Sequence, residues 1–224
     1  MNLPMVASAP GSVPSLEQAV AIAEGALPQV DPGRDRPILV LLSGLPGTGK
    51  SHFARLLAAQ KPFLIVESDR IRKALFSPPD YSSAESALVH RTCHVLIDRK
   101  LAEFLPVIYD ATNLIEHFRE KAYRMAHERR AELVVVRMVA PERVVRKRLR
   151  SRGRERLQKR DREGRRRRGQ GGSGHRSPED RSDADWEVYR LLLDSEEPIA
   201  VPHLVVQATE GAEEGVARVL EALE

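Results

Sequence analysis

The sequence contains a single cysteine, few aromatic residues and no long hydrophobic run. Because Cys93 has no second cysteine to pair with, an intramolecular disulfide is excluded, and with it the class of small disulfide-stabilised domains. The longest aliphatic run, Ile38–Leu42, falls far short of the roughly 20 apolar residues that a membrane-spanning helix needs. Residues 1–14 carry no positive charge and no apolar segment typical of a signal peptide, so we expect a cytoplasmic protein.

The residues that are present suffice for one domain of ordinary size. Of the 224 residues, 42% are hydrophobic and 30% are charged, which excludes a disordered tail and a collagen-like fibre. At this length a hydrophobic share of that size supplies one buried core.

The net charge of +4 conceals a strongly basic segment. From Arg143 to Arg181 the chain has 15 Arg and 2 Lys against 5 acidic residues, so this segment carries +12 and the rest of the chain carries −8. Such an island indicates an anionic partner, which includes nucleic acid. Arg outnumbers Lys 29 to 7 over the whole chain, so a coding bias combined with a solvated loop explains the island equally well.

Hydrophobic periodicity predicts helices that alternate with short apolar strands. The expected strands are 37–43, 63–67, 106–109, 133–139 and 203–207. The expected helices are 15–27, 50–60, 70–76, 83–104, 114–130, 141–152, 186–193 and 213–223. Residues 1–14 are expected to form a disordered leader, and 15–36 a helix and linker before the main domain, 37–224. The Arg- and Gly-rich insertion at about 153–181 has almost no apolar positions and is expected to be mobile.

This order of elements predicts an α/β fold in three layers. Strands without polar alternation, each followed by a helix, are typical of a parallel sheet that is covered on both faces. Right-handed crossovers then bring the loops after the strands to one edge of the sheet, where ligands bind.

The most informative motif is a glycine-rich segment between the first predicted strand and the next helix. It matches the phosphate-binding pattern G-x-x-x-x-G-K-[ST] at each fixed position. The segment consists of Gly44, Leu45, Pro46, Gly47, Thr48, Gly49, Lys50 and Ser51. Its backbone N–H groups would surround the phosphates of a nucleotide, Lys50 would reach the β and γ phosphates, and Ser51 would offer its hydroxyl to Mg²⁺.

A second group of polar residues follows the second predicted strand. Asp69 lies at the ligand edge, where a carboxylate can accept a proton from an acceptor hydroxyl or help to hold Mg²⁺. Arg72 lies one helical turn further along the chain. The structural alternative is that Ser68 or Asp69 caps the following helix.

A third candidate, Asp110, comes just after the third predicted strand. An aspartate at this place can hold a metal-bound water in the manner of a Walker B acid. The nearby pair Asn113 and Glu116 fits a capping box, so we expect these two residues to begin the next helix.

Two arginines complete the candidate site. Arg148 and Arg152 are spaced i, i+4 and therefore lie on one face of the helix after the fourth strand. They could clamp the transferring phosphate, or they could be solvated surface residues; their spacing does not decide between the two.

Two other site types are disfavoured. His90, Cys93 and His94 share a predicted helix, but at most two of them face the same way and no carboxylate has suitable spacing, so we expect no metal site there. No Asn-Lys-x-Asp segment follows the glycine-rich loop, which argues against a GTPase.

Taken in order, the blocks GLPGTGKS, SDRIR, YDATNL and the region from RLRSRG to SDADW resemble a known family. They are similar to the small P-loop kinases related to polynucleotide 5'-hydroxyl kinases and zeta-toxin-like kinases, often filed as AAA-type ATP-binding proteins. The likeness runs from Ile38 to about Leu193. It implies a P-loop kinase fold with a five-stranded parallel sheet in the order 2-3-1-4-5 and a mobile basic lid.

The resemblance also implies roles for single residues. Asp69 and Arg72 match the pair that acts in these relatives as general base and acceptor-binding group. Asp110 matches the acid before a Thr-Asn pair, here with Ala111 between them. Arg152, which precedes Gly153, matches the lid arginine.

The sequence thus predicts an ATP- and Mg²⁺-dependent phosphotransferase with a hydroxyl acceptor. A polynucleotide 5'-hydroxyl and a small sugar or nucleoside fit the motifs equally well, although the low aromatic content argues against a dedicated base-stacking surface. The alternative is an ATP-hydrolysing switch or a nucleic-acid-binding ATPase without an acceptor.

Overall fold

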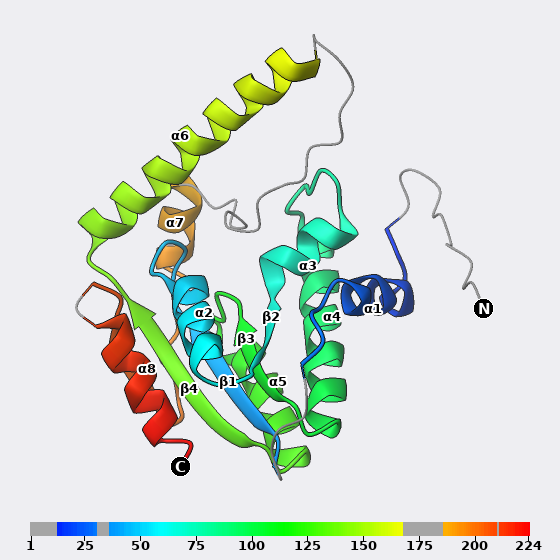
Figure 1. Cartoon of the computed structure of the whole chain (residues 1–224), viewed down its shortest axis with the longest axis vertical. Helices are drawn as coiled ribbons and strands as arrows, with labels where there is room; N and C mark the ends of the chain where they lie inside the picture. The colour runs from blue at the N-terminus through cyan, green and yellow to red at the C-terminus, as the bar shows by residue number, and fades with distance from the viewer. Residues whose placement is uncertain (1–12, 31–35, 168–185, 210) are drawn as a thin grey trace.

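The computed structural model describes residues 13–30, 36–167, 186–209 and 211–224. Its centre is a parallel sheet of five strands in the order β2-β3-β1-β4-β5. Strands β1 to β4 are labelled in Figure 1. The strands are β1 (Ile38–Ser43), β2 (Leu64–Glu67), β3 (Pro106–Asp110), β4 (Glu132–Val139) and β5 (Leu204–Gln207). The predicted strand order is therefore confirmed.

Eight helices surround the sheet in the described part of the chain. They are α1 (Leu16–Gly25), α2 (Lys50–Gln60), α3 (Ser68–Leu75), α4 (Ser83–Ala102), α5 (Glu116–Glu128), α6 (Glu142–Arg167), α7 (Trp186–Leu193) and α8 (Ala212–Glu221). The core on one face of the sheet contains side chains from α1, α3, α4 and α5, and the core on the other face contains side chains from α2 and α8. None of the helices in the described residues is long and apolar enough to cross a membrane.

Strand β1 occupies the centre because its side chains are apolar on both faces. All six of its residues are buried. Leu39 and Leu41 belong to the core beneath α4 and α5, whereas Val40 and Leu42 belong to the core beneath α2 and α8. The alternation that a strand imposes thus fills both cores and fixes the end of β1 between β3 and β4.

Helix α6 is longer than the sequence analysis expects. It continues to Arg167, past the predicted end near Arg152 and through Gly153, so residues 153–167 are helical rather than a loop. Arg, Lys, Gln and Glu dominate this stretch, and these straight-chain residues favour a helix even without an apolar face. Residues 1–12 of the predicted leader, 31–35 of the linker and 168–181 of the lid lie outside the described residues.

The two histidines of α4 pack against β3. His90 Nδ1 lies 3.0 Å from the hydroxyl of buried Tyr109, and the His94 ring meets the Tyr109 ring edge-on at 5.7 Å between centroids. On its other side His90 stacks parallel to Phe118 of α5 at 6.0 Å. No group of three or more metal-ligating side chains occurs in the described residues. Through these ring contacts the two histidines pack between α4, α5 and β3.

This packing lowers the pKa of both histidines to about 4. Burial is the main cause for each ring. The positive charges of Arg72 and Lys121 add to the shift of His90, and His90 and Lys121 add to that of His94. Both rings are therefore neutral in the folded protein at pH 7.

We expect the fold to lose stability when the pH falls from about 6.5 to 4. In that window the unfolded chain binds protons that the folded chain rejects, at a cost of roughly 1–2 kcal/mol for each histidine by pH 5. Urea unfolding at a series of pH values measures this loss. The variant His90→Gln, His94→Gln should flatten the dependence, whereas His127→Gln, on the exposed surface of α5, should leave it unchanged. Equal losses in wild type and the double variant would contradict the assignment.

Candidate functional site

The glycine-rich segment joins β1 to α2 at the carboxyl edge of the sheet. Gly44 has a φ of +145°, and a Cβ at this position would collide with the carbonyl oxygen of Met138 in the neighbouring strand. Gly49, which precedes α2, has a φ of +106° and would bring a Cβ within 3.3 Å of the Arg148 guanidinium. Both positions favour glycine because other residues rarely adopt this backbone, and at Gly44 a side chain would also clash.

Lys50 begins α2 and is buried within the loop. Its Nζ donates to the carbonyl oxygens of Gly44, at 2.8 Å, and Leu45, at 3.0 Å. Burial lowers the pKa of Lys50 to about 8, and the nearby charges of Asp110 and Asp69 oppose that shift. The lysine therefore lies in electrostatic range of both predicted acids.

Asp110 ends β3 and is 3% exposed. Burial raises its pKa, while Lys50 and a hydrogen bond with the side chain of Ser51 oppose the shift. Its Oδ2 atom is buried and has no hydrogen-bond partner among the residues that the structure describes. A buried carboxylate oxygen next to a serine hydroxyl is the kind of hard oxygen pair that Mg²⁺ takes together with water and substrate phosphates. The residues present therefore fit a magnesium ion.

The second predicted pair lies on α3. Asp69 influences the pKa values of both Lys50 and Asp110, so it belongs to the same cluster of charges. The capping alternative is wrong, because α3 already begins at Ser68 and its N-cap is Glu67.

Arg72 has a partner that the sequence analysis did not identify. Its NH1 lies 2.5 Å from Glu85 Oε1, its NH2 donates to Ser86, and its guanidinium lies 4.8 Å from the centre of the Tyr81 ring. Glu85 also accepts a hydrogen bond from the backbone N–H of Asp80. The pair attaches α3 to the start of α4. The Ser82-x-x-Glu85 pattern was readable as a helix start, but nothing in it indicated an arginine partner.

The predicted arginines of α6 both face the phosphate-binding loop. Arg148 donates to the carbonyl oxygens of Gly47, Thr48 and Ala208 over 3.2–3.3 Å. Arg152 is close enough to influence the pKa of Lys50. Together with Gly49, His52, Met138 and Ala212 at the start of α8, these arginines line a pocket of about 530 Å³. The structure thus brings Arg148 and Arg152 to the loop, which their spacing alone could not establish.

The loop after β3 is attached to the end of β1. Asn113, at a φ of +45°, donates from its side chain to the Leu42 carbonyl at 2.7 Å and accepts from the Ser43 hydroxyl at its own carbonyl. The backbone N–H of Gly44 donates to the Thr112 carbonyl. The capping box predicted for Asn113 and Glu116 is therefore wrong: α5 begins after Ile115, without a side-chain cap. The Asn113 amide serves β1 instead.

A fully buried arginine holds this loop in place, and the sequence analysis did not single it out. Arg119 donates to the carbonyl oxygens of Asn113 and Leu114 at 2.7 and 2.6 Å, and to those of Glu197 and Pro198 at 2.9 and 2.6 Å. Its Nε donates to Glu116. One guanidinium therefore joins the loop after β3 to the segment that leads from α7 into β5.

We expect Arg119→Met to lower the free energy of unfolding by about 3 kcal/mol or more, because it removes the five hydrogen bonds that this buried guanidinium donates to two separate segments of the chain. Denaturant unfolding measures this loss. Arg124→Met, at an exposed position of the same helix, is the control and should change the free energy by less than about 0.5 kcal/mol. Similar small changes in both variants would show that the Arg119 hydrogen bonds do not hold the loop.

Comparison with solved structures identifies the fold. APS kinase CysC of Mycobacterium tuberculosis, solved with AMPPNP and APS, is 18% identical, with a TM-score of 0.56 over 85% of this chain and 99% of that chain. Kti12 of Chaetomium thermophilum, solved with ADP-AlF3, is 16% identical, with a TM-score of 0.57 over 83% and 99% of the two chains. A gluconokinase of Sinorhizobium meliloti is 20% identical, with a TM-score of 0.51 over 85% and 97%. The chain therefore has the P-loop kinase fold.

None of the curated proteins matches this sequence. A protein-family model described as an AAA domain matches residues 39–172, more than half of the chain. The match spans β1, the glycine-rich loop, both acids and the two arginines of α6, and the chain therefore belongs to this family of AAA domains.

Proposed function

We propose that this protein is an ATP- and Mg²⁺-dependent phosphotransferase that moves the γ-phosphoryl group of ATP to a hydroxyl acceptor. The observation that carries the proposal is the meeting of Lys50, Ser51, Asp69 and Asp110 at one place on the sheet edge. A phosphate-binding lysine, a pair of oxygen ligands for a metal and a separate carboxylate are the groups that phosphoryl transfer requires.

The phosphates would lie on the backbone N–H groups of the loop, at the N-terminus of α2. Lys50 would leave the carbonyl oxygens that it now contacts and bind the β and γ phosphates. Arg152 adds a second positive charge near Lys50, and Arg148 holds the loop backbone. The pocket of about 530 Å³ beside Gly49 offers room for the remainder of the nucleotide.

Ser51 and Asp110 would hold the magnesium ion, Asp110 directly or through a water molecule. When bound, Mg²⁺ supplies neutralisation of the charge on the β and γ oxygens. Its charge also favours the ionised form of Asp110, which opposes the pKa rise that burial causes.

Asp69 would accept the proton of the acceptor hydroxyl. In this step the acceptor O–H bond breaks and its oxygen forms a bond to the γ phosphorus, while the bond between that phosphorus and the bridging oxygen breaks. ADP leaves with that electron pair. Arg72 would orient the acceptor, and its ion pair with Glu85 keeps the guanidinium in a fixed place. The acceptor is a polynucleotide 5'-hydroxyl or a small sugar or nucleoside.

The test uses γ-labelled ATP and Mg²⁺ with a panel of 5'-hydroxyl RNA and DNA oligomers, nucleosides and sugars. We expect Asp69→Asn to reduce transfer of the label by roughly 100-fold or more, because it removes the proton acceptor. Binding of an ATP analogue should stay near the wild-type level. Glu128→Gln, an exposed carboxylate on α5, is the matched control and should transfer normally.

Two results would contradict the proposal. Transfer that is unchanged in Asp69→Asn would remove Asp69 from the reaction. Release of free phosphate without any labelled acceptor, equal in wild type and variant, would favour the alternative of an ATP-hydrolysing switch.

A further inference from the structure

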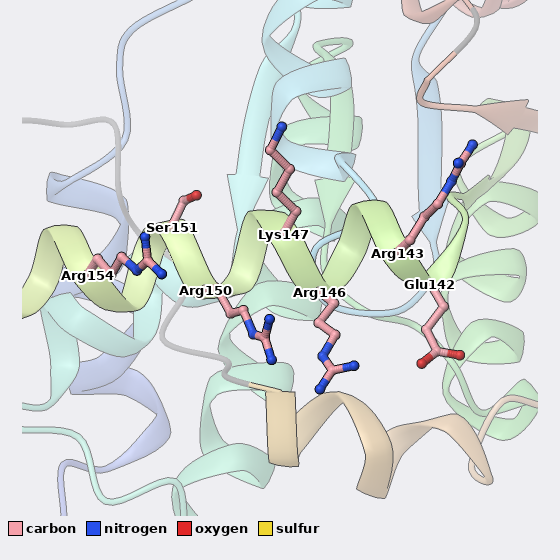
Figure 2. Close-up of a pocket in the computed structure, with 7 residues that line it drawn as sticks. All are labelled: Glu142, Arg143, Arg146, Lys147, Arg150, Ser151 and Arg154. Atoms are coloured by element: carbon pink, nitrogen blue, oxygen red, sulfur yellow. The ribbon is translucent and has the colours of Figure 1, made fainter.

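The outer face of α6 is strongly basic. Its exposed side chains line a groove of about 630 Å³, and Ser151 is the one lining residue without a charge (Figure 2). The basic residues of this groove are Arg143, Arg146, Lys147, Arg150 and Arg154, and the acidic one is Glu142. We call these five basic residues the α6 basic face.

Apart from Lys147, which also lines the pocket beside Gly49, this face is separate from the phosphate-binding loop. Val145 and Leu149 point into a small core with Leu45, and Arg148 and Arg152 point toward the glycine-rich loop. The α6 basic face occupies the remaining side of the same helical turns. Its charges are therefore not needed to hold the loop or to pack the helix.

The described residues offer these side chains no acidic partner. None of the five takes part in the ion pairs found in the described part of the chain, and Arg146 contacts the Trp186 ring at 5.3 Å. Like charges three or four residues apart on a helix repel one another. A surface of this kind is stabilised when an anion binds to it.

We propose that the α6 basic face binds the phosphodiester backbone of a nucleic acid. From Arg143 to Arg154 the helix rises about 17 Å, which is too long for one phosphate group and suits a row of them. The face presents at least one basic side chain in each turn of roughly 5.4 Å, so anions that repeat along a chain can be paired in succession. Four of the five side chains are arginines, whose planar groups bind phosphate oxygens in pairs.

Other anionic partners fit this face less well. A helix that lies on an anionic membrane needs an apolar side to enter the lipid. The apolar side of α6 is already buried against Leu45 and Tyr189, and the groove is lined by charged residues and Ser151. Contacts to phosphates carry no base information, so we expect binding with little dependence on sequence.

The groove also connects to the nucleotide pocket. Lys147 and Ser151 line both of them. In Figure 2 these two side chains point to one side of α6, whereas Arg146 and Arg150 point to the opposite side, toward α7. A strand bound to the α6 basic face would thus pass beside the proposed site of phosphoryl transfer. Binding itself does not depend on the proposed function and is tested without it.

The experiment measures fluorescence anisotropy of labelled oligonucleotides of about 20 nucleotides, with the full chain. Single-stranded RNA, single-stranded DNA and a DNA duplex form separate arms. We expect binding that weakens steeply between about 50 and 200 mM salt. Arg150→Glu combined with Arg154→Glu should lower the affinity roughly 10- to 100-fold. It should also lower the slope of log affinity against log salt concentration by the equivalent of about two phosphate contacts.

The matched control is Arg91→Glu combined with Arg124→Glu, which changes the net charge equally at exposed positions of α4 and α5. It should retain affinity within a factor of about three. Equal losses in both double variants would overturn the proposal, because net charge alone would then explain binding. Wild-type affinity in Arg150→Glu, Arg154→Glu would overturn it as well, as would equally tight binding of polyglutamate or of anionic lipid vesicles.

Discussion

The five hydrogen bonds of the buried Arg119 guanidinium set the position of the whole ligand edge. They hold the loop after β3, and through Asn113 that loop holds the end of β1, from which the glycine-rich segment begins. A fully buried charge is tolerated only when each donor has an acceptor, so the loop has little freedom to move without breaking several bonds at once. Contacts with the sheet and with Arg119 of α5 therefore together fix the position at which the phosphate-binding loop begins.

Two charged side chains, Lys50 and Asp110, lie close together at this edge although burial disfavours their charged forms. Lys50 and Asp110 are both removed from water, and each is shifted toward its neutral form while the charge of the other opposes the shift. Such a pair is held at a cost that a triphosphate and a cation can offset, because the phosphates favour the charged lysine and the cation favours the ionised aspartate. The energetics of these two side chains thus favour an occupant that carries both signs of charge.

Local patterns predicted the strands and the phosphate-binding loop, because strand periodicity and the glycine motif are encoded in contiguous residues. The order of the strands came from the resemblance to small P-loop kinases. The sequence could not predict partners that are distant along the chain. A hydrogen bond joins Arg119 to Pro198, which lies 79 residues further along the chain. An ion pair joins Arg72 on α3 to Glu85 on α4. Asn113 was interpreted as a cap because its spacing to Glu116 fits one, but the carbonyl of Leu42 is the partner that the fold provides.

The side chains of helix α6 lie in three different environments. Its register places Val145 and Leu149 in the core, Arg148 on the loop backbone and Arg150 on the open side. The buried face and the bonds of Arg148 to Gly47 and Thr48 fix the helix at its N-terminal end. Because the helix continues without a break past Arg150 and Arg154, these two basic side chains lie on the same helical segment as Arg148. A long anion that binds along this helix is thereby directed toward the same edge of the sheet at which Lys50 and Asp69 meet.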